Sequence, residues 1–399
     1  MKQIRYLHGA WLLLLAAVLL LGLAITPAGA TNKSTRNVLQ AQNTTPINAT
    51  IYIATSTLAP MFQSHIDQQV PVAVNTAIAN MVSRLPRQDQ GWAQQMATTL
   101  IQPSASLVSF VPQQGGIAAT ILLSLYPGDP KAISANLLFS FSVADSSTVQ
   151  VTAIPMSGSP SLASGPVSTF HIPVGQLNSV ATTPTCGDAA LALNLQVPIS
   201  LGSANSSIQA QQAAMISSSN ASLLTALTTQ HSSNSTNTSN VGGRFIVHPQ
   251  SLAPSSVSSY IEIPASSLAA VGSSVGSLPI SSSFTAKNIQ VSVQGSNLDV
   301  TSDIYWGGLN IGTADTLVAP TAANGNLAIR VLSTTLHVLF FNVPYNTYNQ
   351  QIQQTLNSKL GHAFAGKFYV TQAAIGANSH VPCAANSSLI LTGITNIGG

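Results

Sequence analysis

The sequence predicts an α+β fold in which curved antiparallel sheets wrap around long amphipathic helices. Two hydrophobic periodicities support it, because apolar residues recur at steps of three and four in some segments and at every second position in others. A third observation is the lack of charge. A typical globular protein carries about 25 % charged residues, whereas this chain has 5 %, with Glu262 as its sole glutamate. Few side chains are therefore left for acid–base or metal chemistry.

The N-terminus has the pattern of a secretory signal peptide. Lys2 and Arg5 precede an apolar run from Trp11 to Ile25, and small residues follow up to Ala30. We expect residues 1–30 to be removed after Ala30, which places the protein outside the cell. A retained membrane anchor is the alternative, but the run is shorter than the roughly 20 residues of a spanning helix.

Composition divides the rest of the chain into four segments. Residues 31–57 are rich in Thr, Asn and Gln and are predicted to be a polar tether. A unit of one helix and an antiparallel meander follows over 58–201, and 202–243 is a Ser/Asn-rich linker or loop. The segment 244–399 is a second strand-rich unit, with a helix over 344–361.

The first unit begins with a long apolar stripe at helical spacing. Pro71 lies inside this stripe and predicts a kink or break, and Pro86 ends it. A second short helix is plausible with Trp92, Met96 and Leu100 on one side. The stripe consists of Phe62, Ile66, Val70, Val74, Ile78, Met81 and Leu85. Alternating apolar residues then predict strands over 117–125, 137–143, 149–153 and 191–199.

The second unit contains the strongest hairpin motif of the chain, Asn324-Gly325, which favours a two-residue turn between strands. A helix is predicted after Pro344. Its apolar stripe consists of Tyr345, Tyr348, Ile352, Leu356, Leu360 and Phe364.

Cys186 and Cys383 both lie in the exported part of the chain, so a single disulfide between them is the natural expectation. Two separate buried thiols are the alternative. The eight histidines show no close ligand spacing, so we expect no metal site and no cofactor.

Two segments resemble each other, the one from Phe170 to Leu177 and the one from Ile261 to Leu268. Both suggest a strand end, a Pro at the first helical position and a short helix anchored by Leu. Chance in a low-complexity composition and a duplicated unit of sheet plus helix are both open explanations.

The I-x-I-P-x-x-x-L pattern of Ile261 to Leu268, next to alternating strands and a long striped helix, resembles bacterial tubular lipid-binding proteins. Within these proteins, the chain most resembles the secreted phospholipid-binding, LmeA-like group. The resemblance implies a bent sheet that wraps a helix around an apolar groove. It covers most of 56–399 as pattern and carries over no ligand-contact residue.

The function predicted from these features is non-enzymatic binding of a lipid or another hydrophobic small molecule in an apolar groove. A membrane or cell-wall surface is a candidate second partner. Nucleic acid is not expected, because no cluster of Lys or Arg could follow a phosphate backbone. The candidate groove residues are Phe62, Ile66, Val70, Phe139, Phe141, Ile352 and Leu356.

Two other functions remain open. A structural or adhesive surface protein would use flat exposed aromatic residues such as Tyr305 and Trp306. A serine hydrolase would use Ser274, because Gly272 to Gly276 satisfies G-x-S-x-G. The context of that motif disfavours hydrolysis, since the residues before it suggest a helix instead of a buried strand. We therefore assign no catalytic residue.

Overall fold

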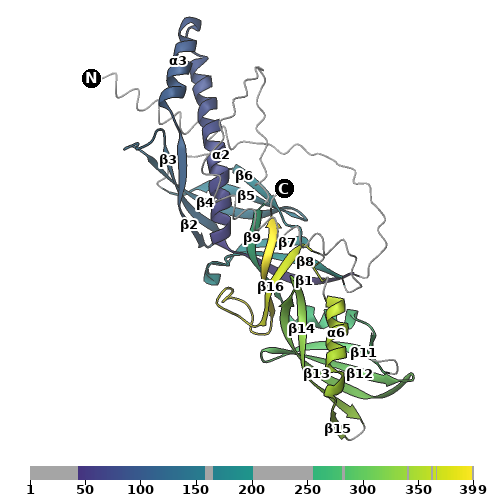
Figure 1. Ribbon diagram of the computed structural model, residues 1–399. Helices are drawn as coiled ribbons and strands as arrows, with labels where there is room; N and C mark the ends of the chain where they lie inside the picture. Colours follow the sequence, from purple (N-terminus) through teal and green to yellow (C-terminus); the bar gives the residue numbers. More distant parts are fainter. Residues whose placement is uncertain are drawn as a thin grey trace, which may run out of the picture.

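The computed structural model describes residues 44–157, 165–200, 255–280, 284–338, 341–360, 363–364 and 366–397. Within these residues, 17 strands form three antiparallel sheets; three of the four α-helices lie against a sheet, and the fourth packs on another helix. The molecule is elongated: a central sheet lies between a sheet that carries the two N-terminal helices and a sheet at the opposite end (Figure 1). The predicted signal peptide over 1–30 and the predicted linker over 202–243 fall outside the described residues.

The central sheet joins strands from both halves of the chain. Its middle strand β1 pairs with β8 from the first half and with β9 from the second. Ile51 of β1 is aligned with Leu193 on one side and with Ile261 on the other, and all three are fully buried. The two halves therefore share one core. In spatial order the strands are β16 (Phe368–Ile375), β17 (Leu389–Ile397), β9 (Ser255–Ile263), β1 (Thr44–Ile53), β8 (Leu191–Ser200) and β7 (Gln176–Thr182).

The second sheet is a five-stranded meander that supports helix α2 (Thr55–Val82). The first turns of α2 bury Leu58 and Phe62 against it. The short helix α3 (Arg87–Leu100) then runs back along the far half of α2. The strands of this N-terminal sheet are β2 (Ser104–Gln113), β3 (Gly116–Ser124), β4 (Ile133–Asp145), β5 (Thr148–Pro155) and β6 (Gly165–His171).

The third sheet, which we call the C-terminal sheet, is packed by helix α5 (Ala265–Ser274) and helix α6 (Asn349–Leu360). A 3₁₀ turn over Asn346–Tyr348 leads into α6. The strands of this sheet follow in sequence order: β10 (Leu278–Pro279), β11 (Phe284–Gln294), β12 (Asn297–Trp306), β13 (Leu309–Ala323), β14 (Asn326–Val338) and β15 (Phe341–Pro344).

The predicted architecture of sheets wrapped around long helices is wrong. Strands dominate the described residues, and three of the helices lie against a sheet without being enclosed: α2 against β2, α5 against β11, and α6 against β14, whereas α3 packs on α2. The prediction failed because helical periodicity reports that one face is apolar, but not what that face meets. The second half of α2 shows this, because it buries its stripe against another helix.

Several local predictions are confirmed. Strands occupy the segments with alternating apolar residues, and the sheet from β2 to β6 is an antiparallel meander. Asn324 and Gly325 form the turn between β13 and β14, both with positive φ (51° and 76°), as a type I′ turn requires. Helices are present in both segments where apolar stripes predicted them.

Three local predictions differ from the structure. The predicted tether over 31–57 is wrong for its second half, since Thr44–Ile53 is the middle strand of the central sheet. Of the kink or break predicted at Pro71, the break does not occur, because helix α2 runs through Pro60 and Pro71 as one element. The segment from Phe170 to Leu177 leads into strand β7 and not into a helix, whereas Ile261 to Leu268 does lead from β9 into α5.

The predicted disulfide between Cys186 and Cys383 is present, with the two Cα atoms 4.9 Å apart. It lies in a small buried cluster that includes Tyr52 and Tyr260. Next to it, the Glu262 carboxylate accepts hydrogen bonds from the Tyr52 hydroxyl (2.7 Å) and the Ser388 hydroxyl (2.7 Å). Burial and this carboxylate raise the pKa of Tyr52 above its ordinary value. The one glutamate of the chain thus links the central strands to the disulfide loop.

Candidate functional site

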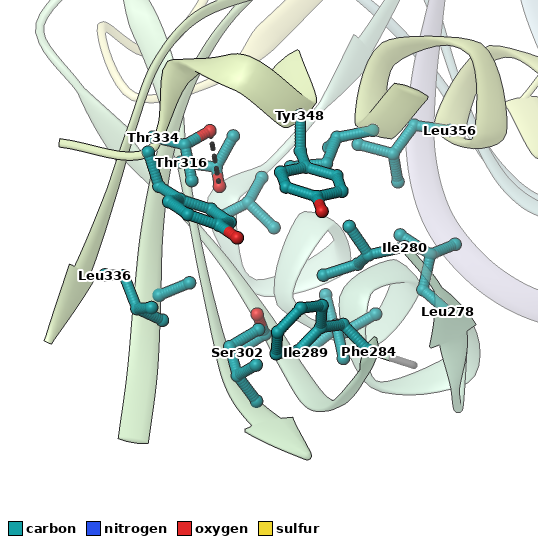
Figure 2. A pocket seen from close by; sticks show the side chains of 16 residues that line it. Leu278, Ile280, Phe284, Ile289, Ser302, Thr316, Thr334, Leu336, Tyr348 and Leu356 are labelled. Carbon is teal, nitrogen blue, oxygen red and sulfur yellow. Dashed lines mark hydrogen bonds between the residues drawn. The ribbon is translucent and has the colours of Figure 1, made fainter. Parts of the chain in front are cut away.

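An apolar cavity lies between the inner face of the C-terminal sheet and helix α6, near the distal end of the molecule (Figure 2). Its volume is about 40 Å³. Tyr348 and Leu356 extend into it from the helical side, and Phe284 and Ile289 lie opposite on β11. Because side chains alternate between the two faces of a strand, the sheet supplies its apolar face to this cavity and its polar face to solvent.

A second cavity of about 80 Å³ lies next to the first, between α5, α6 and the end of the central sheet. Apolar residues alone line it, including Leu268 of α5 and Ile263 of β9. Ile289, Val300 and Leu356 line both cavities, so these three side chains form the partition between them. We call the two cavities and this partition the apolar seam.

The end of the seam near β15 is more polar. Tyr345 and Tyr348 stack there with ring centroids 4.9 Å apart. Burial and the hydrogen bond with Tyr348 raise the pKa of Tyr345, so the Tyr345 phenol stays protonated at neutral pH. The hydroxyls of Thr316 and Thr334 meet on the cavity wall at 3.5 Å. A ligand in the seam would therefore meet hydrogen-bonding groups at one end and hydrocarbon elsewhere.

Helix α6 is fastened to the sheet by amide side chains. β15 pairs with β14 only from Thr335 onward, which leaves the earlier part of that edge of β14 without a partner strand. Asn357 of α6 fills the gap: its Oδ1 accepts from the Ile329 N–H (2.7 Å) and its Nδ2 donates to the Ile329 carbonyl (3.0 Å). Gln353 accepts from the Val331 N–H at 3.0 Å. The amides of α6 thus replace the backbone groups of a missing strand.

Helix α2 is attached to the edge strand β2 in the same way. The Gln63 side chain donates to the Ala105 carbonyl (2.9 Å) and accepts from the Leu107 N–H (2.6 Å). In a chain with so little charge, amides take the positions at helix–sheet contacts that hydrogen-bonding groups must fill.

The structure places the predicted groove residues in two separate regions. Phe62 and Phe139 pack against each other (ring centroids 5.0 Å) and against Phe110, and both predicted residues are only 3 % exposed. They belong to the packed core between α2 and the N-terminal sheet. Ile66, Val70 and Phe141 are half-buried around that core. Ile352 and Leu356 line the apolar seam instead.

Sequence reasoning missed most of the seam. Tyr345 and Tyr348 stood on the predicted stripe of the last helix but were not chosen as site residues. Phe284, Ile289 and Val300 come from strands, and their alternation marks an apolar face without telling whether the face is filled. Only the distance between sheet and helix creates the cavity.

The G-x-S-x-G motif forms the end of helix α5 and does not form a nucleophile elbow. The Ser274 hydroxyl donates to the Val271 carbonyl of its own helix (2.7 Å). The nearest candidate base by chain order, His337, has both ring nitrogens engaged, with Asp315 at 2.8 Å and Asn342 at 2.7 Å. These two contacts raise the pKa of His337. Ser274 and His337 therefore do not form a nucleophile–base pair.

An open polar groove of about 820 Å³ runs along the outer face of β11–β13, next to this motif. Asp303 and Asp315 lie in it together with Lys287, whose ammonium is 4.4 Å from the ring centroid of Tyr305. The groove is mixed in polarity and charge. Neither cysteine nor histidine lines this groove. Among the described residues, no group of three or more His, Cys, Asp or Glu is arranged to hold a metal ion.

Among the described residues, no helix has the length and apolar character needed to cross a membrane. Comparison with known proteins adds no relative: no family model matches the chain, and neither a curated protein nor a solved structure is significantly similar to it.

Proposed function

We propose that this chain is an exported protein that binds an apolar or amphiphilic small molecule, such as a single acyl chain, in the apolar seam. One observation carries the proposal: two apolar cavities lie next to each other and are separated only by the side chains of Ile289, Val300 and Leu356. Ligand sites are typically apolar with few polar groups. The seam has this composition, with its hydroxyl groups gathered near one end.

The size of the cavities requires the seam to open. Cavities of about 40 and 80 Å³ are smaller than the roughly 150 Å³ that holds one benzene molecule. An acyl chain can therefore enter only if the partition side chains turn away or α6 moves from the sheet. The amide bonds of Asn357 and Gln353 resist this movement, but each hydrogen bond contributes only about 1 kcal/mol net. Opening of α6 is thus compatible with a stable fold.

The expected orientation of the ligand follows from the polarity of the seam. The tail occupies the all-apolar cavity near Leu268, and the polar end lies at Tyr345 and Tyr348. Leu268 belongs to the segment that resembles tubular lipid-binding proteins, and this position at the seam supports the same ligand class. Export is supported by the N-terminal pattern and by the Cys186–Cys383 disulfide, which is typical of oxidising compartments.

The test is a titration of the exported protein with cis-parinaric acid, whose fluorescence rises when it leaves water. We expect saturable binding that Val300→Phe weakens at least about tenfold, because the larger ring fills the partition. Leu332→Ala is the matched control, since this half-exposed side chain of β14 lines neither cavity. If Val300→Phe does not fold, Ser302→Leu narrows the first cavity at a half-buried position. Equal binding by folded variants and wild type would refute the proposal.

A second candidate is adhesion through the tip of the β12–β13 hairpin. Trp306 is 56 % exposed and Leu309 is 70 % exposed there, whereas Tyr305 is half-buried beneath Lys287. Exposed aromatic residues of this kind favour contact with another surface. Trp306→Ser with Leu309→Ser should abolish attachment of the protein to cell-wall material while cis-parinaric acid binding stays unchanged.

A further inference from the structure

The far half of α2 and the helix α3 form a hairpin that extends beyond the N-terminal sheet (Figure 1). The two helices are joined by residues 83–86 and share a small apolar cluster of their own. Val74, Ala77 and Ile78 of α2 are buried in it, and Ala97 and Ile101 pack against them. This cluster holds the two helices of the hairpin together on their facing sides, so the hairpin can present its outer side to a partner.

The outer side of α3 carries a second apolar stripe that nothing in the described structure covers. Trp92, Met96 and Leu100 follow each other at steps of four, which places them on one face of the helix. Trp92 is 67 % exposed and Leu100 is 60 % exposed, and α3 has no buried residue at all. Ala97 packs on α2, and its sequence neighbour Met96 leaves the helix in a different direction. The contact between α2 and α3 therefore leaves the stripe exposed to solvent. Contiguous exposed apolar residues mark an interaction site.

The turn between the two helices is basic. Arg84 and Arg87 flank Leu85, which is itself 41 % exposed. After residue 40, no two other basic residues lie so close in the sequence. Neither arginine forms an ion pair within the part of the chain that the structure describes, and Asp89 is the one acidic residue in α3. The end of the hairpin therefore combines a net positive charge with exposed apolar side chains.

We propose that the α2–α3 hairpin docks on an anionic lipid surface. Trp92, Met96 and Leu100 enter the boundary between headgroups and acyl chains, and Arg84 and Arg87 contact anionic headgroups. An amphipathic helix with Trp and Leu on one side and basic residues beside it has this behaviour at membrane interfaces. The charge complementarity favours a lipid surface over a second copy of the chain, whose matching hairpin would bring like charges together. The proposal does not depend on a ligand in the apolar seam.

The test uses the exported protein with the substitution Trp306→Phe. Trp92 is then the one tryptophan within residues 31–399, so the fluorescence comes from the hairpin. Vesicles of equimolar phosphatidylcholine and phosphatidylglycerol should shift Trp92 emission to the blue, and brominated acyl chains should quench it. Arg84→Gln and Arg87→Gln should each weaken binding about fivefold at low salt. The double variant Trp92→Ser with Leu100→Gln should bind the vesicles at least about tenfold more weakly, as measured by co-sedimentation. Vesicles of phosphatidylcholine alone should show no dependence on the arginines.

Val108→Ser is the matched control, because Val108 is as exposed as Leu100 but lies on β2. Vesicle binding that survives the Trp92/Leu100 variant, or that is lost with Val108→Ser, overturns the proposal. It is also overturned if Trp92 resists acrylamide quenching before vesicles are added, which would show that the chain itself covers the stripe. A dimer in sedimentation equilibrium that Trp92→Ser dissociates would assign the hairpin to self-association instead. Cis-parinaric acid binding should be unchanged in every hairpin variant.

Discussion

Asp188 caps helix α2 at Ser56, although the two residues are 132 positions apart in the sequence. The Asp188 carboxylate accepts from the Ser56 hydroxyl (2.6 Å), the Thr55 hydroxyl (2.7 Å) and the Ser56 N–H (2.8 Å), whereas the N-cap residue Ala54 has no side chain that could do so. Asp188 follows Cys186 by two residues, so the loop that carries the disulfide also fixes the start of the longest helix. Burial alone would raise the pKa of Asp188, but these hydrogen bonds hold it below its ordinary value.

Asp188→Ala should destabilise the protein by about 1–2 kcal/mol at neutral pH, because the first turn of α2 loses its cap. The folded-state pKa of Asp188 is depressed, so its stabilisation is present above the ordinary carboxyl pKa of about 3.9 and is lost as pH falls through the folded value. The difference between variant and wild type should therefore shrink in acid. Urea unfolding at neutral pH and in acid measures this, with Asp89→Ala as an exposed control. A difference that stays constant with pH would contradict the assignment.

Removal of the disulfide should destabilise the protein by up to about 5 kcal/mol, because the bond closes a loop with a sequence separation of 197 residues. Cys186→Ala together with Cys383→Ser is the appropriate variant, since Cys186 is fully buried beside Tyr52 and a serine hydroxyl there would be buried without a partner. The wild type in reducing agent should show the same loss. If the double variant unfolds at the same urea concentration as the wild type, the bond does not constrain the unfolded chain in this way.

The turn residues show which parts of the fold the sequence could predict. Asn324-Gly325 specifies its hairpin because only residues that tolerate positive φ fit the turn, and that preference is local. The order of strands in the central sheet is not local. Thr44–Ile53 has the polar composition of a tether, but its Ile47, Ile51 and Ile53 alternate, and pairing with two distant strands buries them.

The two prolines of α2 show that tertiary packing can also preserve an element that the local sequence predicts to be interrupted. A proline removes one helical hydrogen bond, which predicts a break when the segment is considered alone. The packing of Leu58 and Phe62 before Pro71, and of Val74 and Ile78 after it, holds the helix as one element. Helical stripes also predicted Ile352, Leu356 and Phe62 as groove residues. Ile352 and Leu356 line an apolar cavity, whereas Phe62 packs against Phe110 and Phe139 in a filled core.

Gly325→Ala should destabilise the protein more than Gly115→Ala. Both glycines have positive φ (76° and 87°), so both substitutions carry a backbone cost of about 1–2 kcal/mol. A Cβ at Gly325 would in addition overlap the ring of Tyr369, whereas no heavy atom lies within 4 Å of a Cβ at Gly115. We expect a further loss of about 1–3 kcal/mol at Gly325 from this overlap. Thermal unfolding of the two variants measures the difference, and equal losses would show that the Tyr369 ring moves aside freely.

Asn357→Ala should loosen helix α6 from the edge of β14. The substitution leaves the Ile329 N–H and carbonyl without their partner, which costs about 1–3 kcal/mol. If α6 is the element that opens, the association rate of cis-parinaric acid should rise while the bound complex stays similar. Thr355→Ala is a suitable control, because its hydroxyl bonds within α6 to the Gln351 carbonyl. Hydrogen exchange at Ile329 gives a direct measure, and unchanged protection there would argue against opening.

Leu356→Ala should join the two cavities of the apolar seam into one. Leu356 is 8 % exposed and lines both cavities, so its truncation should destabilise the protein by about 2–5 kcal/mol. Ile352→Ala is the matched control: it lies one turn earlier on α6 and lines only the first cavity. Both variants lose stability by a similar mechanism, but only Leu356→Ala removes part of the partition. If the seam is the binding site, Leu356→Ala should bind cis-parinaric acid more tightly than Ile352→Ala, and bound ligand should recover part of its lost thermal stability. Equal affinities in the two variants, measured by the same titration, would place the ligand elsewhere.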